Sequence, residues 1–323
     1  MDAREEYVLR IAQRQRRGRG LSDAAYAELL LAVRHDPERF AGAPQDESMA
    51  LLGRALDRYA ASVGADESRD DEEYLRARQV RLSTLQEACA AILRQDPSCV
   101  DARLCALIAR DLDPDDLLWQ LKGLERDALP SLETADGGRG ADPWSDVLCR
   151  PALRVKAAIC RTYLESARYD RARKSALELL RLSPLDCLGA RHTAALACAR
   201  LEDEPGFEAL VARFGGRGDA WQGLARLILL FKLARPAAAR RALAGYDRLC
   251  EGGVFALLRP VYVEPYMPDR PATAPYGFDE ATLAVHEADA IIVDVPDLVS
   301  WVESVPGMTE SAAAFARRSG FEF

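Results

Sequence analysis

The spacing of apolar residues is the feature that most restricts the fold of this 323-residue chain. Through nearly all of residues 1–250, Leu, Ala, Val and Ile recur at positions i, i+3, i+4 and i+7. This spacing places them along one face of an α-helix, and that face must be buried against another element. Ala and Leu, which are strong helix formers, dominate these stretches. We therefore predict an all-α protein.

The bulk composition excludes several classes of protein. Hydrophobic residues make up 49% of the chain, too many for intrinsic disorder, and no apolar run reaches the roughly 18 residues of a membrane-spanning helix. The length suits two domains or one elongated domain. The 43 basic residues include only four lysines, and 51 acidic residues give a net charge of −8. That charge repels a polyanion at long range, so we do not expect a nucleic-acid partner.

The helical pattern is interrupted at positions that mark turns. Ser22 is a favourable N-cap, and Asp96 precedes Pro97, which ends a helix. The acidic run 66–74 is expected to be a solvated connector and helix N-terminus, where carboxylates are favourable. Helices are predicted over residues 2–16, 22–35, 47–63, 74–95, 100–110 and 115–128, with later turns at 183–184, 204–206, 215–218 and 235–236.

A proline-rich segment separates the last third of the chain from the preceding helices. Residues 258–276 carry prolines at 260, 265, 268, 271 and 275, which exclude a helix there. Helical patterns resume over residues 279–290, 296–305 and 309–318. Four aromatic residues of this region are expected to pack back onto the preceding hairpin as a cap, or alternatively to fill a groove: Tyr262, Tyr266, Tyr276 and Phe278.

Residues 151–184 form a 34-residue unit of two amphipathic stretches closed by a proline. Cys160 falls at the close-contact position of the first helix, Tyr163 at an aromatic position, and Ala172 at the small position of the second helix. Small side chains are needed where two helices cross closely. This unit resembles the tetratricopeptide repeat, whose period is 34 residues.

Two further stretches read as copies of the same unit. Residues 185–214 place Ala194 at the first small position, and residues 219–246 place Trp221, Leu224, Ala225 and Ala237 at aromatic, apolar and small positions. Tandem units predict an α-solenoid of antiparallel helix hairpins. The predicted organisation is an N-terminal helical region over 1–130, a linker over 131–143, the repeat array over 144–250, and a Pro/Tyr-rich segment with capping helices over 251–323.

Residues 150–305 also resemble a more specific group, bacterial helical-repeat proteins related to the ST7-type family. The resembling stretches are SPLDCLGAR (183–191), residues 207–232, the proline segment through Tyr276, and VPDLVSWVES (295–304). The chain departs from the family in having His192 where a second aromatic residue is usual. The resemblance implies an α-solenoid interaction scaffold and implies no established chemistry.

The eight cysteines are expected to be reduced and buried. Most lie within Ala/Leu-rich helical stretches, where cysteine behaves as a small hydrophobic residue, and the N-terminus has no apolar secretory segment. We therefore expect a cytoplasmic protein. No CxxC pair occurs, and none of the three histidines stands at metal-ligand spacing, so neither a metal nor a cofactor is predicted.

Catalytic motifs are absent from the sequence, and we predict that the chain is not an enzyme. It contains no phosphate-binding loop, dinucleotide fingerprint, nucleophile elbow or HExxH zinc motif. The tetrapeptide GGRG occurs at 137–140 and 215–218, where turns are expected rather than anion sites. His192 is expected to be a packed or surface residue, and the arginines at 14, 16, 17 and 19 a solvated helix end.

Four arginines map to the groove face of the repeats, where the first helix of each hairpin lies: Arg154, Arg161, Arg191 and Arg226. Arginine grips carboxylates with two parallel hydrogen bonds. We therefore expect this groove to bind an acidic peptide segment or a C-terminal carboxylate. The alternative is that these arginines face outward or pair with Glu165 and nearby acids.

The sequence thus predicts a cytoplasmic scaffold that binds a protein or peptide partner in the concave face of the array. Two other classes stay open. One is a helical-array enzyme, which would need a deep pocket with converging acids or a nucleophile of perturbed pKa. The other is a nucleic-acid-linked regulator that uses the N-terminal arginines. The sequence assigns neither an oligomeric state nor the identity of a partner.

Overall fold

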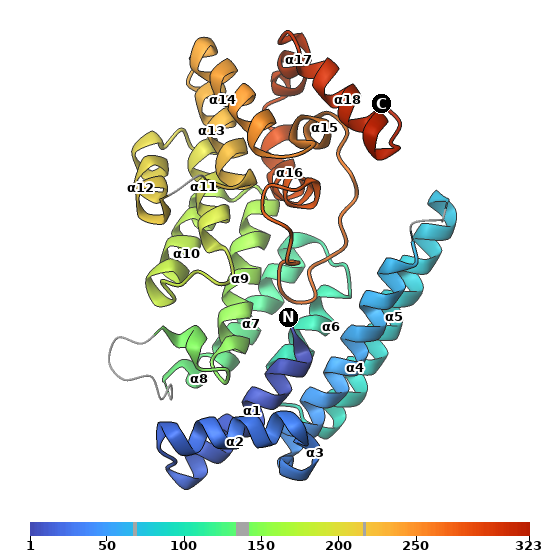
Figure 1. Cartoon of the computed structure of the whole chain (residues 1–323), viewed down its shortest axis with the longest axis vertical. Helices are drawn as coiled ribbons and strands as arrows, with labels where there is room; N and C mark the ends of the chain where they lie inside the picture. Colours follow the sequence, from blue (N-terminus) through green and yellow to red (C-terminus); the bar gives the residue numbers. More distant parts are fainter. Residues whose placement is uncertain (67–69, 134–141, 216–217) are drawn as a thin grey trace. The chain divides into compact units, whose positions relative to one another are not determined.

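The structure is a computed structural model that describes residues 1–66, 70–133, 142–215 and 218–323 (Figure 1). Every regular element among these residues is helical, which confirms the all-α prediction. The chain divides into two compact units. The first comprises residues 1–155 and 265–270, and the second comprises residues 156–264 and 271–323. This division falls within α9 (Arg150–Glu165), whereas the sequence placed its domain limits at residues 131–143 and 251.

The first unit contains the helices predicted for the N-terminal region, together with short ones that the apolar spacing did not mark. Ser22 caps α2 by accepting a hydrogen bond from the Ala25 N–H, and Asp96 ends α5, as expected. Asp70 caps α5, so the described part of the acidic run is a helix N-terminus. The helices are α1 (Ala3–Arg19), α2 (Asp23–His35), α3 (Pro37–Phe40), α4 (Pro44–Gly64), α5 (Asp71–Gln95), α6 (Val100–Ile108), α7 (Pro114–Ala128), α8 (Pro130–Glu133), the one-turn 3-10 helix η1 (Pro143–Ser145) and the start of α9.

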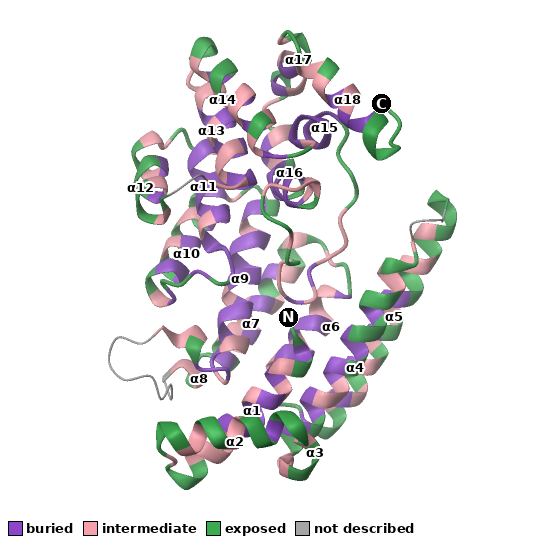
Figure 2. Cartoon of the chain, viewed as in Figure 1, coloured by how far each residue is buried: buried purple, intermediate pink, exposed green. Residues whose placement is uncertain are grey.

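The core of the first unit forms where α4 packs against α1 and α5, and α5 against α6. Met49 and Leu52 of α4 and Leu85, Cys89 and Ile92 of α5 are all buried there. In contrast, α2 buries only Val33 and remains mostly exposed (Figure 2). The amphipathic faces read from the sequence thus make contact mainly between helices that are close in the chain.

The second unit begins with the C-terminal part of α9 and continues through nine further helices. Its helices are α10 (Tyr169–Leu182), α11 (Ala190–Arg200), α12 (Glu204–Phe214), α13 (Ala220–Lys232), α14 (Pro236–Leu249), α15 (Gly253–Leu258), α16 (Phe278–Val293), α17 (Asp297–Ser304) and α18 (Met308–Ser319). The turn predicted at 204–206 is wrong, because these residues form the first turn of α12. Asp203 caps that helix, and Pro205 is tolerated there because the first helical N–H groups have no partner within the helix.

Small residues lie at close helix contacts in the second unit. The Cys160 Sγ of α9 is 3.2 Å from the Ser175 Oγ of α10, and Ala172, Ala194 and Ala225 are fully buried. α11 packs against both α10 and α13, and α13 packs against α14. Ala237, however, is exposed.

The position expected for Ala237 is occupied instead by Ala239, which is fully buried. The small position of α14 was therefore placed two residues too early.

Residues 259–277 form no helix, as their prolines require. The following helix α16 packs against α11 and α13, while α15 packs against α14, α16, α17 and α18. The short α15 was not predicted, because six residues between glycines and a proline show no clear period.

The aromatic residues of the proline-rich region do not act as one group. Phe278 packs against Phe255 of α15, with ring centroids 5.9 Å apart, rather than against the preceding hairpin that the sequence suggested. Tyr266 belongs to the first unit and is buried. Tyr262 is 56% exposed, so the prediction that Tyr262 is buried is wrong. Tyr276 lines a cavity that is described below.

Six of the eight cysteines are buried, as predicted for small hydrophobic residues, and no disulfide joins any of the eight. None of the described helices combines the length and the apolar character that a membrane crossing requires.

Candidate functional site

Arg154 is not on an open groove but in a buried ion cluster of the first unit. Its Nε lies 2.9 Å and 3.0 Å from the two carboxylate oxygens of Asp269, and its Nη1 is 3.2 Å from Asp101. Glu6 accepts two further hydrogen bonds, and the side chain of Arg154 is completely buried. Burial alone would lower the pKa of Arg154, but these carboxylates raise it well above its ordinary value.

The guanidinium of Arg154 is therefore unavailable to a peptide, and the prediction that Arg154 lines an open groove is wrong. A charge buried this deeply persists only when it is paired and hydrogen-bonded.

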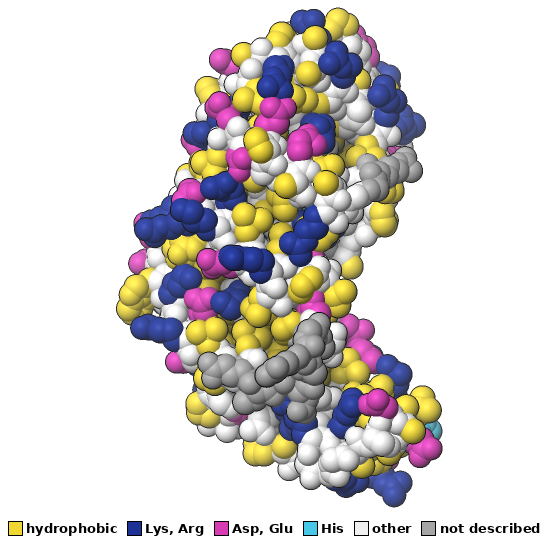
Figure 3. All heavy atoms as spheres, turned by 90° about the vertical axis from the view of Figure 1, so that its left-hand side faces the viewer, with side chains coloured by type: hydrophobic (Ala, Val, Ile, Leu, Met, Phe, Trp, Pro, Cys, Tyr) yellow, Lys and Arg dark blue, Asp and Glu magenta, His cyan; other side chains and the backbone are white. Residues whose placement is uncertain are grey.

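The other three arginines lie in the second unit and are also close to acids. Arg161 is buried, and its charge opposes the rise in the pKa of Glu165 that burial causes. Arg226 forms a two-pronged pair with Glu208, at 2.7 Å and 3.2 Å, on an exposed surface. Arg191 lines a cavity of about 360 Å³ that is described below, and Arg226 lines a neighbouring cavity of about 530 Å³. Figure 3 likewise shows Lys and Arg side chains beside Asp and Glu. The arginines that were expected to make the groove positive therefore lie beside acids that largely neutralise their charge.

The N-terminal arginines are neutralised in the same way. Arg16 pairs with Asp23 at 2.6 Å, and Arg14 and Arg17 pair with Asp46 and Asp146. Of the two GGRG segments, residues 137–140 lie outside the described part of the chain, as do residues 216 and 217 of the second.

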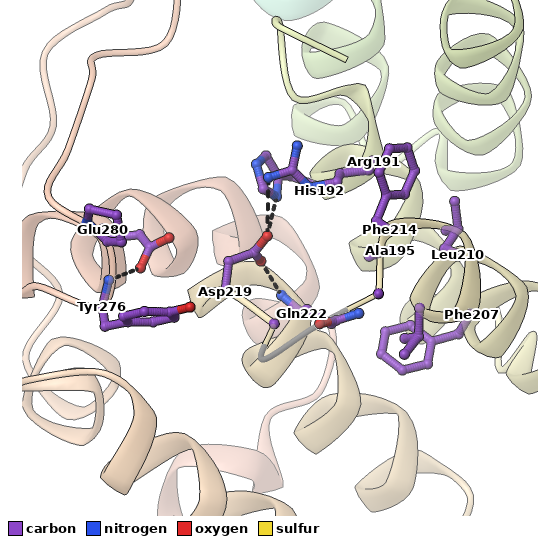
Figure 4. Close-up of a pocket in the computed structure, with 14 residues that line it drawn as sticks. Arg191, His192, Ala195, Phe207, Leu210, Phe214, Asp219, Gln222, Tyr276 and Glu280 are labelled. Carbon is purple, nitrogen blue, oxygen red and sulfur yellow. Dashed lines mark hydrogen bonds and ion pairs between the residues drawn. The ribbon is translucent and has the colours of Figure 1, made fainter. Parts of the chain in front are cut away.

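The second unit contains a cavity of about 360 Å³ among α11, α12, the start of α13 and the residues that lead into α16 (Figure 4). Phe207, Leu210 and Phe214 of α12 form an apolar wall. The other side is polar, and its side chains come from three segments: Arg191, His192, Asp219, Gln222, Tyr276 and Glu280. A concave site with an apolar wall and a few converging polar groups is the usual form of a ligand-binding site.

Helix N-termini bring the acids of this site together. Asp219 caps α13 by accepting a hydrogen bond from the Gln222 N–H at 2.9 Å, and Asp186 accepts one at 2.6 Å from the Ala190 N–H at the start of α11. Acids are favoured at these positions because unpaired N–H groups point toward them. Gly218 precedes Asp219 with φ of +87°, where a Cβ would lie 2.5 Å from the Gln222 side-chain oxygen. Since α11 and α13 pack together, their capping acids lie near each other.

Arg191 bridges the two capping acids. Its Nη1 is 2.9 Å from Asp186 and its Nη2 is 3.3 Å from Asp219, while its guanidinium carbon lies 5.6 Å from the centre of the Phe214 ring. Its charge is therefore already matched by two carboxylates before any ligand enters.

His192 is packed, as predicted, with 6% of its surface exposed. Its ring stacks on Trp221 at 4.1 Å, and its Nδ1 lies 3.6 Å from an Asp219 oxygen. The imidazole thus fills a position beside Trp221 where an aromatic side chain would also stack.

The two cavity-lining acids have pKa values shifted in opposite directions. Burial would raise the pKa of Asp219, but His192, the Gln222 N–H and Arg191 together lower it well below its ordinary value. For Glu280, which is 7% exposed, burial is the largest effect and raises the pKa. The Tyr276 N–H donates to this carboxylate at 2.5 Å, and a hydrogen bond from the Ala220 N–H and the charge of Arg191 also oppose the rise in its pKa.

Of the residues that line this cavity, Arg191 was expected from the sequence, whereas the acids Asp219 and Glu280 were not. An acid just before or at the start of a helix is a common cap, so Asp219 gave no distinctive signal. Glu280 lies within the first turn of α16, where acids are also common.

Comparisons of the chain with family models, with curated proteins and with solved structures found no match. The described residues include no cluster of three or more His, Cys, Asp and Glu that could hold a metal ion.

Proposed function

We propose that this chain is a helical-repeat scaffold that binds a segment of another protein in the cavity between α11, α12 and the start of α16. The observation that carries the proposal is the cavity itself, with its apolar wall from α12 and converging polar groups from three segments. The resemblance to tetratricopeptide and ST7-type proteins, which implies an interaction scaffold, also supports it. The cytoplasmic location expected from the sequence is part of this proposal.

Affinity capture from the native host tests this function. The full chain is compared with the variant Phe207→Ala/Tyr276→Ala, which removes two aromatic sides of the cavity, and with Glu208→Gln, which alters an exposed ion pair outside the cavity lining. We expect a partner that is retained by the wild-type chain and by Glu208→Gln and lost by the cavity variant. Recovery of the same proteins by all three chains would contradict the proposal.

A second candidate function is acid–base catalysis in the same cavity. It is favoured by the opposite pKa shifts of Asp219 and Glu280, with His192 beside Asp219. A screen with ester, phosphoester and amide substrates tests it, because turnover that disappears in Glu280→Gln would support catalysis.

A further inference from the structure

We propose that the cavity takes a cationic side chain of the partner, a guanidinium or ammonium group on an alkyl stem, as in arginine or lysine. This inference rests on the proposed function, because it specifies what part of a bound segment enters the cavity. It differs from the sequence expectation of an acidic ligand.

The charges around the cavity favour a cationic ligand. Arg191 is its one arginine among the lining residues, and Asp186 and Asp219 already engage both of its terminal nitrogens. Glu280 adds a third carboxylate, which accepts hydrogen bonds from the Tyr276 and Ala220 N–H groups and feels the charge of the same Arg191. Three carboxylates thus share one arginine, with His192 beside Asp219. A buried carboxylate is strongly favoured by a cationic partner. An entering cation would supply that partner, whereas an entering carboxylate would meet like charge.

The walls of the cavity also suit a cationic side chain. Tyr276 on one side and Phe214 on the other are partly exposed, and Phe207, which also lines the cavity, is fully buried (Figure 4). Aromatic faces attract alkylammonium and guanidinium groups, and an apolar wall accommodates the methylene stem of such side chains. Phe207 and Phe214 already lie within 5.0 Å and 5.6 Å of guanidinium carbons of this chain, those of Arg226 and Arg191.

The size and polarity of the cavity also suit such a group. Its volume of about 360 Å³ accommodates one long side chain, and a neighbouring cavity of about 530 Å³ shares Val211, Gly218 and Gln222 with it. The carboxylates of Asp219 and Glu280 are acceptors only, and a donor-rich group such as guanidinium complements them.

The decisive experiment is calorimetric titration of the wild-type chain with capped Gly-X-Gly tripeptides. X is arginine, lysine, citrulline or glutamate; citrulline keeps the shape of arginine but lacks its charge. We expect saturable binding of the arginine or lysine peptide, binding of citrulline that is at least about tenfold weaker, and no binding of glutamate. Equal affinity for arginine and citrulline, or preferred binding of glutamate, would overturn the inference.

A variant series locates the binding. Glu280→Gln is expected to lower the affinity for the arginine peptide at least about tenfold, whereas Glu208→Gln is expected to leave that affinity unchanged. Because a variant could perturb folding, the indole N–H resonance of Trp221, assigned with Trp221→Phe, provides a readout on the wild-type chain. It should shift on addition of the arginine peptide, since Trp221 stacks on His192, which lines the cavity. Binding that leaves this resonance unmoved would contradict the assignment.

The experiments can contradict the cationic ligand without contradicting the scaffold function. A partner that depends on Phe207 and Tyr276 but binds equally well with a neutral residue in the cavity overturns only the cationic ligand. A set of captured proteins unchanged by the cavity variant overturns the scaffold function itself.

Discussion

At the scale of single residues, burial of the ionised Glu280 carboxylate destabilises the folded state. Its folded-state pKa is raised by burial, so its ionisation opposes folding. The stabilisation that the protonated carboxyl gives is fully present below the pKa of the unfolded state and is lost as the pH rises through the folded-state pKa. A group that destabilises the fold near neutral pH and faces a cavity is typical of a binding role.

Glu280→Gln is therefore expected to unfold at the same temperature as the wild type or higher at pH 7, although it loses affinity for a cation. The difference between the two chains should shrink as the pH falls toward 4, where the wild-type carboxyl becomes protonated. Thermal unfolding followed by circular dichroism over this pH range measures it. A variant that is less stable by a constant amount at every pH would show that the carboxylate has a structural role.

Arg154 presents the opposite case, a charge whose removal is expected to damage the fold. Arg154→Ala leaves Glu6, Asp101 and Asp269 with far less compensation, and we expect a loss of about 3–5 kcal/mol in the free energy of unfolding. Arg226→Ala, which removes a half-exposed pair with Glu208, should cost less than about 1 kcal/mol. Urea denaturation of both variants compares the two costs, and similar losses would contradict the buried-cluster interpretation.

At the scale of elements, the helix ends that depend on capping and on proline follow local sequence, and most were predicted. The side-chain positions that depend on packing between helices were not predicted. The contact position in α14 is Ala239 rather than Ala237, because two residues of shift along a helix rotate a side chain to another face. Likewise α15 is too short to show a period, and it is held by the aromatic side chains around it.

A substitution at Gly252 tests whether close packing of aromatic rings positions α15. It begins that helix with φ of +66°, and an added Cβ would lie 2.6 Å from the Phe315 ring and 2.8 Å from the Phe278 ring. Gly252→Ala is expected to cost about 2–3 kcal/mol through overpacking and backbone strain. Gly245 of α14 has open space where its Cβ would be, so Gly245→Ala should be neutral or stabilise by up to about 1 kcal/mol. Thermal unfolding distinguishes the two, and equal effects would contradict this packing.

At the scale of the whole molecule, the net charge of −8 conceals a surface on which basic and acidic side chains are closely paired. The total charge still favours approach of a cationic ligand. The affinity for the arginine tripeptide should therefore fall by about threefold or more when salt rises from about 0.05 M to about 0.5 M. Calorimetry at the two salt concentrations measures this effect, and tighter binding in high salt would contradict it.

The helical class, the proline breaks and the burial of most cysteines follow from local sequence, because helix periodicity, capping and steric exclusion act between neighbours in the chain. Which charges meet depends instead on how the helices pack. Arg154 was expected on a groove and lies in a buried cluster, and Asp219 and Glu280, far apart in sequence, share one cavity. The physical reason is that a charge has no preferred partner within a helical pattern. Its partner, its burial and its pKa follow from the packing of helices against one another.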